Sequence, residues 1–379
     1  MASVLISCGE PSGDLYAGAL VDALRRLDPG LTARGLGGER LRAAGAALVG
    51  DYRGIAVTGL IEAVRVLPAS LGLYRRLVNA ARTERPDVFV AIDFPDFNFR
   101  VAGAMRRLGI PVVYYIPPQV WAWRSGRMRT LRSLADRILV IFPFEPEIYR
   151  AAGVPATFVG HPLVDLSVAS CPREAFLRGL GLDPGRPTLA LLPGSRPNEV
   201  RQILPTLVDA LPRISDRVPG VQYALARAPG LADELFAPLA SSPVPVTVVE
   251  RSADEVLSSA DAVVTASGTA TVQAAIHECP MVIVYRVAPL SYAIGRRFVH
   301  VDTFGMVNLV AGERVAPELI QRGFTAEAVA DHAVHLLTDR AARARAIAAL
   351  RDVKARLGGG GASRRAAEIV LETARSHAR

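Results

Sequence analysis

Short apolar runs alternate with longer amphipathic stretches along the whole chain. The runs are four or five residues long, rich in Val, Ile and Leu, and mostly lack the polar alternation of a half-exposed strand. Such runs are typical of strands buried on both faces of a parallel sheet. We predict strands at Val4–Ser7, Val88–Ile92, Val112–Ile116, Ile138–Ile141, Thr157–Val159, Thr188–Leu192, Gln222–Ala226, Thr247–Val249, Ala262–Thr265 and Met281–Tyr285. Stretches with apolar residues at helical spacing separate most of them, so the fold class is α/β with doubly wound parallel sheets.

The alternation pauses once, which divides the chain into two domains. Residues 165–187 are irregular and carry three prolines, and the strand-helix pattern restarts at Thr188. We therefore predict domains at 1–165 and 166–379. The last stretch, 325–378, reads as Ala/Arg/Leu-rich helix interrupted at 358–361, and its terminal helices have the option of packing back on the first domain.

Residues 59–82 allow two interpretations. Leucines and valines mix there with arginines, and Pro68 interrupts the pattern, which predicts two short helices. Their apolar side chains either face the core or form a membrane-surface patch with flanking arginines. The Gly-rich stretch at 35–38 reads as a tight turn, without a convincing strand before it.

Composition narrows the classes of function. The chain has 379 residues, 50% hydrophobic, with a net charge of +8 carried almost entirely by Arg. A basic surface suits phosphorylated ligands or anionic headgroups, and no nucleic-acid-binding motif accompanies it. No apolar run is long enough for a transmembrane helix, and no signal peptide precedes the first strand. The three cysteines lie far apart and predict neither a disulfide nor a metal site, so we expect a cytoplasmic protein.

Asp93 is the first candidate for chemistry. It directly follows the buried run Val88–Ile92, and Pro95 prevents the strand from continuing. The carboxyl ends of strands in open α/β sheets are where ligands bind. Phe94 and Phe97 give this carboxylate apolar neighbours, which suits a proton acceptor. The alternative is that Asp93 only caps the following helix.

Two loops of the second half are candidate anion sites. Gly194-Ser195-Arg196 combines an approachable backbone, a hydroxyl and a guanidinium fork. Ser267-Gly268-Thr269 opens a helix whose N–H groups and dipole favour negative charge, unless Ser267 merely caps that helix. Together they are compatible with a nucleotide diphosphate. No P-loop lysine motif, Asp-x-Asp dyad or His/Cys cluster is present, so we expect neither a metal nor a cofactor. His161 is a weaker catalytic candidate.

The order of the motifs resembles one family along nearly the whole chain. The matching motifs, in chain order, are Gly9-Glu10-Pro11-Ser12-Gly13-Asp14, Ile92-Asp93-Phe94-Pro95-Asp96-Phe97-Asn98, Val120-Trp121-Ala122-Trp123-Arg124, Phe142-Pro143-Phe144-Glu145, Leu192-Pro193-Gly194-Ser195-Arg196, Ala266-Ser267-Gly268-Thr269-Ala270 and Asn308-Leu309. They resemble the lipid-A-disaccharide synthase family. The resemblance implies a GT-B glycosyltransferase, with two Rossmann-like domains facing across a cleft. It implies inverting transfer of 2,3-diacylglucosamine from UDP to 2,3-diacylglucosamine 1-phosphate, giving a β-1,6-linked disaccharide.

The resemblance also assigns roles to residues. Asp93 would be the catalytic base. The acceptor side would be lined by Glu10, Ser12, Asp96 and Asn98. UDP would be held by Gly194, Ser195, Arg196, Ser267, Gly268, Thr269, Gln273, Asn308 and Glu313. The resemblance implies a Glu that contacts the ribose hydroxyls where this chain has Gln273. The sequence therefore does not determine how Gln273 changes the affinity for the UDP-sugar donor.

The sequence also allows two other functions. One is another GT-B enzyme of UDP-sugars, of the peptidoglycan transferase or epimerase type. Another is a non-catalytic lipid- or nucleotide-binding relative. Diacylated substrates lie in a bilayer, which favours the membrane-patch reading of 59–82 and peripheral association with the inner membrane. Acyl-chain length and oligomeric state, including a homodimer, do not follow from the sequence.

Overall fold

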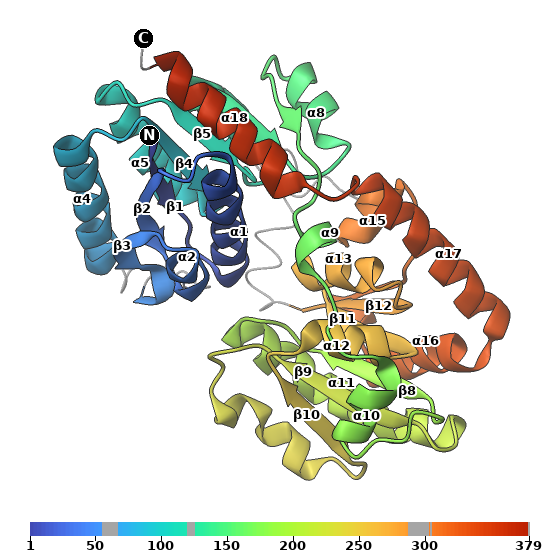
Figure 1. Ribbon diagram of the computed structural model, residues 1–379. Coiled ribbons are helices and arrows are strands. Elements are labelled where there is room, and N and C mark those ends of the chain that lie inside the picture. Colours follow the sequence, from blue (N-terminus) through green and yellow to red (C-terminus); the bar gives the residue numbers. More distant parts are fainter. Residues whose placement is uncertain (55–66, 120–125, 287–302, 304, 378–379) are drawn as a thin grey trace. The chain divides into compact units, whose positions relative to one another are not determined.

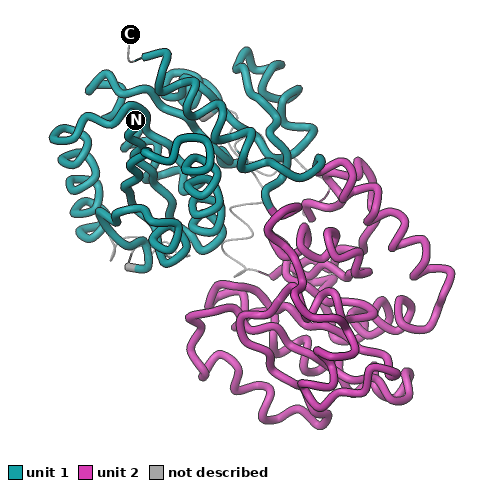
Figure 2. Tube along the Cα trace, viewed as in Figure 1, with its two compact units in different colours: residues 1–162, 358–379 teal, residues 163–357 magenta. Residues whose placement is uncertain are grey.

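The chain folds into two compact units, each built around a parallel sheet. The structure is a computed structural model that describes residues 1–54, 67–119, 126–286, 303 and 305–377. Unit 1 comprises Met1–Pro162 and Gly358–Arg379, and unit 2 comprises Leu163–Leu357 (Figure 2).

Unit 1 alternates strand and helix from its first residues. Its described elements are β1 (Ser3–Ser7), α1 (Pro11–Leu27), β2 (Thr32–Gly37), α2 (Glu39–Ala43), β3 (Ala47–Asp51), a 3-10 turn (Tyr52–Gly54), α4 (Leu67–Glu84), β4 (Val88–Ile92), α5 (Pro95–Arg107), β5 (Val112–Tyr115), α7 (Gly126–Leu134), β6 (Arg137–Val140), α8 (Glu145–Ala151), β7 (Thr157–Phe158) and α18 (Ala362–His377) (Figure 1).

The strands of unit 1 lie in the order β3-β2-β1-β4-β5-β6-β7, all parallel. The chain runs outward from β1 to β3, then returns to start again at β4. The strand order therefore reverses between β1 and β4, which is the topological switch point where open α/β sheets bind ligands. Alternate strand residues such as Leu5, Phe89 and Tyr114 pack with α4, α5 and α7 in one core cluster. Helices α1 and α18 pack against each other and against β4.

Unit 2 repeats this plan. Its described elements are α9 (Leu163–Leu166), α10 (Arg173–Gly179), β8 (Thr188–Leu192), α11 (Pro197–Arg217), β9 (Gln222–Arg227), a 3-10 segment (Asp233–Ser241), β10 (Val246–Glu250), α12 (Ala253–Ser259), β11 (Ala262–Ala266), α13 (Thr269–Ile276), β12 (Met281–Tyr285), α15 (Met306–Ala311), β13 (Glu318–Ile320), a 3-10 turn (Gln321–Gly323), α16 (Ala326–Thr338) and α17 (Arg340–Arg356). Its parallel strand order, β10-β9-β8-β11-β12-β13, reverses between β8 and β11.

The sequence placed the domain boundary differently from the structure. We predicted domains at 1–165 and 166–379, with terminal helices that could pack back on the first domain. Unit 2 begins at Leu163, and the final helix α18 belongs to unit 1. Apolar residues of α18, among them Ala366 and Val370, are fully buried. Arg365 also donates a hydrogen bond to the carbonyl of Val159, 2.9 Å away. Sequence periodicity could show that this helix has a buried face, but not which sheet it covers.

One local prediction was wrong. The Gly-rich stretch at 35–38 overlaps strand β2, where a Cβ on Gly35 would lie 2.0 Å from the carbonyl oxygen of Ile6. Glycine is thus needed for close strand approach rather than for a turn. The prediction of two helices within 59–82 stays a prediction, because Pro68 lies in the first turn of α4 and residues 59–66 are outside the described residues. Residues 55–66 and the tryptophan motif at 120–124 lie outside the described residues.

Candidate active site

Asp93 lies at the switch point of unit 1, immediately after β4. Its φ is 45°, and that of Phe94 is 51°, so two consecutive residues adopt the left-handed conformation. Ile116, at the end of the neighbouring β5, has a φ of 56°. For residues other than Gly this costs on the order of 1–3 kcal/mol each and persists only where surrounding contacts enforce it. The N-cap of α5 is Phe94, so Asp93 precedes the cap rather than forming it.

Partly buried hydrogen bonds hold the backbone of Asp93 in this conformation. Its carbonyl oxygen accepts from the Asn98 side-chain amide at 2.8 Å and from the Tyr114 hydroxyl at 3.0 Å. Its N–H donates to the carbonyl of Ile116 at 3.1 Å. The half-buried carboxylate therefore projects from a fixed point of the main chain.

Asn98 connects the two strands of the switch point. It is fully buried, accepts from the Ser7 hydroxyl at 2.6 Å, and donates to the carbonyls of Ser7 and Ile92 as well as that of Asp93. The sequence suggested an acceptor-binding role, but these contacts are those of a residue that positions its neighbours. Asp96, by contrast, is exposed on the first turn of α5.

The loop after β1 reaches the same switch point. Glu10 is the N-cap residue of α1 and Ser12 lies in its first turn, both half-buried. Asp14 from the same motif is buried instead. Its carboxylate accepts from the backbone N–H groups of Gly38 and Arg40 at 2.6 and 2.9 Å, which caps α2. Within this motif Glu10 and Ser12 are the polar side chains that are partly exposed to solvent.

Glu145 and His161 of unit 1 are buried, and their contacts are with other parts of the fold. Glu145 is buried and accepts from the N–H of Phe142 at 3.0 Å. His161 is buried beside the rings of Tyr16 and Phe142. Burial lowers the pKa of His161 to about 3, so its imidazole is neutral at physiological pH.

The first anion loop of unit 2 follows β8, at its switch point. The backbone N–H groups of Ser195 and Arg196 both donate to one carboxylate oxygen of Glu199, at 3.0 and 3.3 Å. The Arg196 guanidinium contacts the other oxygen at 3.1 Å. Gly194 has a φ of 125°, which favours glycine. Sequence reasoning missed Glu199, although Glu at the third helical position is the signature of a capping box. Its contacts demonstrate that this loop holds an anionic oxygen.

The second anion loop follows β11, across the same switch point. The N–H of Ser267 donates to the carbonyl of Val284 at 3.0 Å, and Gly268 is the N-cap residue of α13, with a φ of 147°. Gly268 and Thr269 are exposed, and a Cβ on Gly268 would meet no described atom within 4 Å. The loop is thus open to a ligand at the start of a helix.

The remaining donor-side candidates divide into two kinds. Gln273 is half-buried on α13, and Glu313 is exposed after α15. Asn308 is buried, with its amide donating to Ala316 O and Glu318 and its oxygen accepting from two backbone N–H groups. Asn308 therefore shapes the loop that carries Glu313.

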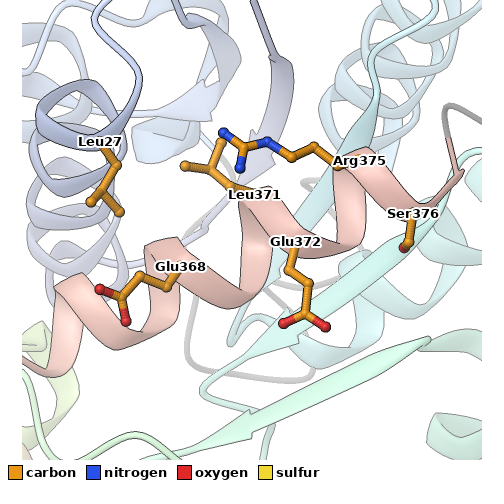
Figure 3. A pocket seen from close by; sticks show the side chains of 6 residues that line it. All are labelled: Leu27, Glu368, Leu371, Glu372, Arg375 and Ser376. Atoms are coloured by element: carbon orange, nitrogen blue, oxygen red, sulfur yellow. The ribbon is translucent and has the colours of Figure 1, made fainter.

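Other features add no second site. Among the described residues no cluster of three or more His, Cys, Asp or Glu could hold a metal ion, and no described helix is long and apolar enough to cross a membrane. An open surface hollow of about 600 Å³ lies along α18, lined by charged side chains and two leucines (Figure 3). None of the candidate residues lines this hollow.

Comparison with known proteins gives a consistent result. The family model described as "Lipid-A-disaccharide synthetase" matches residues 4–372. A lipid-A-disaccharide synthase of Koribacter versatilis is 46% identical over 381 residues, covering 99% of each chain. One of Geobacter metallireducens is 44% identical over 370 residues, covering 97% of this chain and 96% of the relative.

Solved structures share the fold at much lower identity. UDP-GlcNAc 2-epimerase from Neisseria meningitidis bound to UDP-GlcNAc has a TM-score of 0.68 at 12% identity, covering 98% of this chain and all of that one. S. aureus MnaA with UDP has a TM-score of 0.67 at 13% identity, covering 97% and 95%. At such identities the likeness concerns the fold alone, which is the GT-B arrangement of two Rossmann-like sheets.

Proposed function

Since this chain belongs to the lipid-A-disaccharide synthase family, we propose that it condenses UDP-2,3-diacylglucosamine with 2,3-diacylglucosamine 1-phosphate. The products are the β-1,6-linked lipid A disaccharide 1-phosphate and UDP. The protein is accordingly a hexosyltransferase of lipid A biosynthesis.

The observation that supports this function most strongly is the clamped backbone from which the Asp93 carboxylate extends. This carboxylate projects from a left-handed backbone at the switch point of unit 1, where a bound sugar would meet it. Inverting transfer needs one base on the acceptor hydroxyl. As that hydroxyl attacks the anomeric carbon, its proton passes to the Asp93 carboxylate, and the bond from that carbon to the diphosphate breaks.

The acceptor is held around Asp93. Glu10 and Ser12 from the β1 loop and the exposed Asp96 bind its sugar, and Asn98 contributes by fixing the backbone of Asp93. A carboxylate needs no activation beyond a fixed position beside the reacting hydroxyl. The hydrogen bonds from Asn98 and Tyr114 provide that position.

The leaving diphosphate requires positive charge. We assign this to the Gly194-Ser195-Arg196 loop and to Ser267, Gly268 and Thr269 at the start of α13, with Gln273 and Glu313 toward the nucleoside. Backbone N–H groups, a helix N-terminus and one guanidinium neutralise the charge without a divalent cation. The Glu199 carboxylate accepts hydrogen bonds from the backbone N–H groups of Ser195 and Arg196. It must rotate away or share these N–H groups when the diphosphate binds.

The substrates lie in a bilayer, and we assign membrane contact to α4. Leu67 and Leu71 are 52% and 47% exposed on its first turns, and Arg75 and Arg76 are exposed further along the helix. Exposed leucines next to arginines match an anionic lipid surface. The protein then works in the cytoplasm, associated peripherally with the inner membrane.

Turnover tests the proposal directly. Purified protein with both diacylated substrates should yield the disaccharide 1-phosphate by mass spectrometry, with equimolar UDP. UDP-GlcNAc alone tests the alternative that the protein is an epimerase, because solved structures with a similar fold include a UDP-GlcNAc 2-epimerase. Epimerisation of UDP-GlcNAc without any disaccharide product would refute the proposal.

A further inference from the structure

A carboxylate holds the side chain of Gln273 in unit 2. The Gln273 amide nitrogen lies 3.2 Å from Oδ1 of Asp254, which is on the first turn of α12. Helices α12 and α13 pack against each other, so the contact joins two adjacent elements. It involves a donor-site position at which the resemblance to the family implies Glu instead of Gln.

Asp254 is itself firmly held. Its Oδ1 also accepts from the hydroxyl of the buried Ser167 and lies 3.0 Å from Nε2 of His277. This is not a nucleophile relay, because such a relay has the carboxylate on Nδ1 and the hydroxyl on Nε2. Here both Ser167 and Asp254 contact Nε2 of His277. The cluster thus serves to fix the carboxylate.

The charge of Asp254 determines how the amide of Gln273 is oriented. Burial raises the pKa of Asp254, but hydrogen bonds from His277, Ser167 and Gln273 outweigh it and hold the pKa below its ordinary value. An ionised carboxylate only accepts hydrogen bonds, so the amide nitrogen must face it and the amide oxygen must face away. Gln273 therefore presents an acceptor, as a glutamate would.

We propose that Asp254 is a positioning residue of the donor site, which fixes the Gln273 amide so that Oε1 accepts a hydrogen bond from a ribose hydroxyl of UDP. The inference rests on the proposed function, which assigns Gln273 to the nucleoside. The pair carries a single negative charge, located on Asp254. A glutamate at 273 would place a second carboxylate against the first, so Asp254 and Gln273 act as a matched pair.

The test is a cycle of variants measured by calorimetric titration with UDP, 2′-deoxy-UDP and 3′-deoxy-UDP. Asp254→Asn keeps the shape but lets the amide of Gln273 turn. We expect it to reduce the preference for UDP over a deoxy analogue by roughly 2- to 13-fold, the equivalent of one net hydrogen bond. Gln273→Glu alone should weaken UDP binding through repulsion from Asp254. The double variant Asp254→Asn/Gln273→Glu should bind UDP more tightly than Gln273→Glu does.

Ser170→Ala is the matched control. It removes a hydrogen bond to Glu255, the residue next to Asp254 on α12, and contacts neither Asp254 nor Gln273, so it should retain the ribose preference. The inference is overturned if Asp254→Asn retains that preference, or if Gln273→Glu alone binds UDP as tightly as wild type. It is also overturned if wild type binds UDP without preferring it to either analogue, a result that leaves the proposed function intact. Absence of UDP binding by wild type would instead contradict the proposed function itself.

Discussion

The ring of Phe94 occupies the space in which a side chain on Gly9 would begin. A Cβ at Gly9 would lie 2.2 Å from the Phe94 ring, well inside van der Waals contact. Gly9 follows β1 and Phe94 follows β4, so this close approach joins the two loops of the switch point. Because Phe94 is bonded directly to Asp93, the absence of a side chain at position 9 is a condition for the position of the candidate base.

Gly9→Ala should therefore lower kcat. The added methyl displaces the Phe94 ring and strains the left-handed backbone of Asp93, at an overpacking cost of typically 1–3 kcal/mol. Steady-state kinetics and thermal unfolding measure the two effects. Gly72→Ala is the control, since a Cβ there meets no described atom within 4 Å. Wild-type kcat in Gly9→Ala would contradict the coupling between the two loops.

Asp93→Asn should reduce kcat by about 10²–10⁴-fold, the usual contribution of a general base. This corresponds to roughly 3–5 kcal/mol of barrier. The amide keeps the shape but cannot take the proton, and UDP affinity should change little because the donor residues belong to the other unit. Asp96→Asn, on the first turn of α5, is the comparison variant, because Asp96 is assigned to binding the acceptor rather than to proton transfer. If Asp96→Asn abolishes turnover while Asp93→Asn retains more than about a tenth of it, the base has been assigned to the wrong carboxylate.

The sequence predicted the parts of this site that depend on local signals. A β-branched run ending in Asp93 and then Pro95 specifies a buried strand and the place where it stops. The Gly9–Phe94 contact, the burial of Asn98 and the return of α18 to unit 1 depend on packing between segments far apart in the chain, which periodicity does not encode. Glu199 was missed for a different reason, because it lies three residues beyond the motif Gly194-Ser195-Arg196, whose glycine, hydroxyl and guanidinium alone were interpreted.

His161 should make the folded state sensitive to acid. Its pKa is about 3 in the folded protein, against an ordinary value of 6.5 in the unfolded chain. Between these values the unfolded chain binds a proton that the folded protein does not. The contribution of neutral His161 to the free energy of unfolding is fully present above pH 6.5. It is lost as pH falls toward 3, by up to about 1.4 kcal/mol per pH unit.

Denaturant unfolding of wild type and His161→Gln across pH 3–7 measures this contribution. The variant has no imidazole to protonate, so the free energy of unfolding should fall less steeply in this range than that of wild type. Parallel slopes for the two proteins would show that His161 is not protonated on unfolding.

Arg196→Ala should weaken UDP binding and slow transfer, because the diphosphate loses a charged hydrogen bond worth roughly 1.5–3 kcal/mol. Calorimetry with UDP and steady-state kinetics measure both effects. Arg201→Ala is the control, since Arg201 is exposed one turn further along α11.

Turnover should also persist in excess chelator. Activity that is lost in chelator and returns with magnesium would show that a metal, rather than Arg196 and the helix N-termini, neutralises the diphosphate.

Leu67→Ser/Leu71→Ser should release the protein from membranes. Each leucine transferred from water into the apolar part of a bilayer contributes about 1.5–3 kcal/mol, and a nearby arginine adds about 1 kcal/mol at an anionic surface. Flotation with vesicles containing phosphatidylglycerol measures the bound fraction. Arg75→Ser/Arg76→Ser should reduce binding mainly at low ionic strength, because salt screens the attraction.

A variant of Leu77, on the same helix, distinguishes loss of membrane contact from loss of folding. It is buried in the core of unit 1, so Leu77→Ser should lower Tm, whereas Leu67→Ser/Leu71→Ser should leave Tm nearly unchanged. The membrane assignment requires both results together, a folded double variant and a loss of flotation. If the double variant unfolds, Leu67 and Leu71 serve packing. If it floats like wild type, the protein binds lipid through another surface, and α4 is only the outer layer of unit 1.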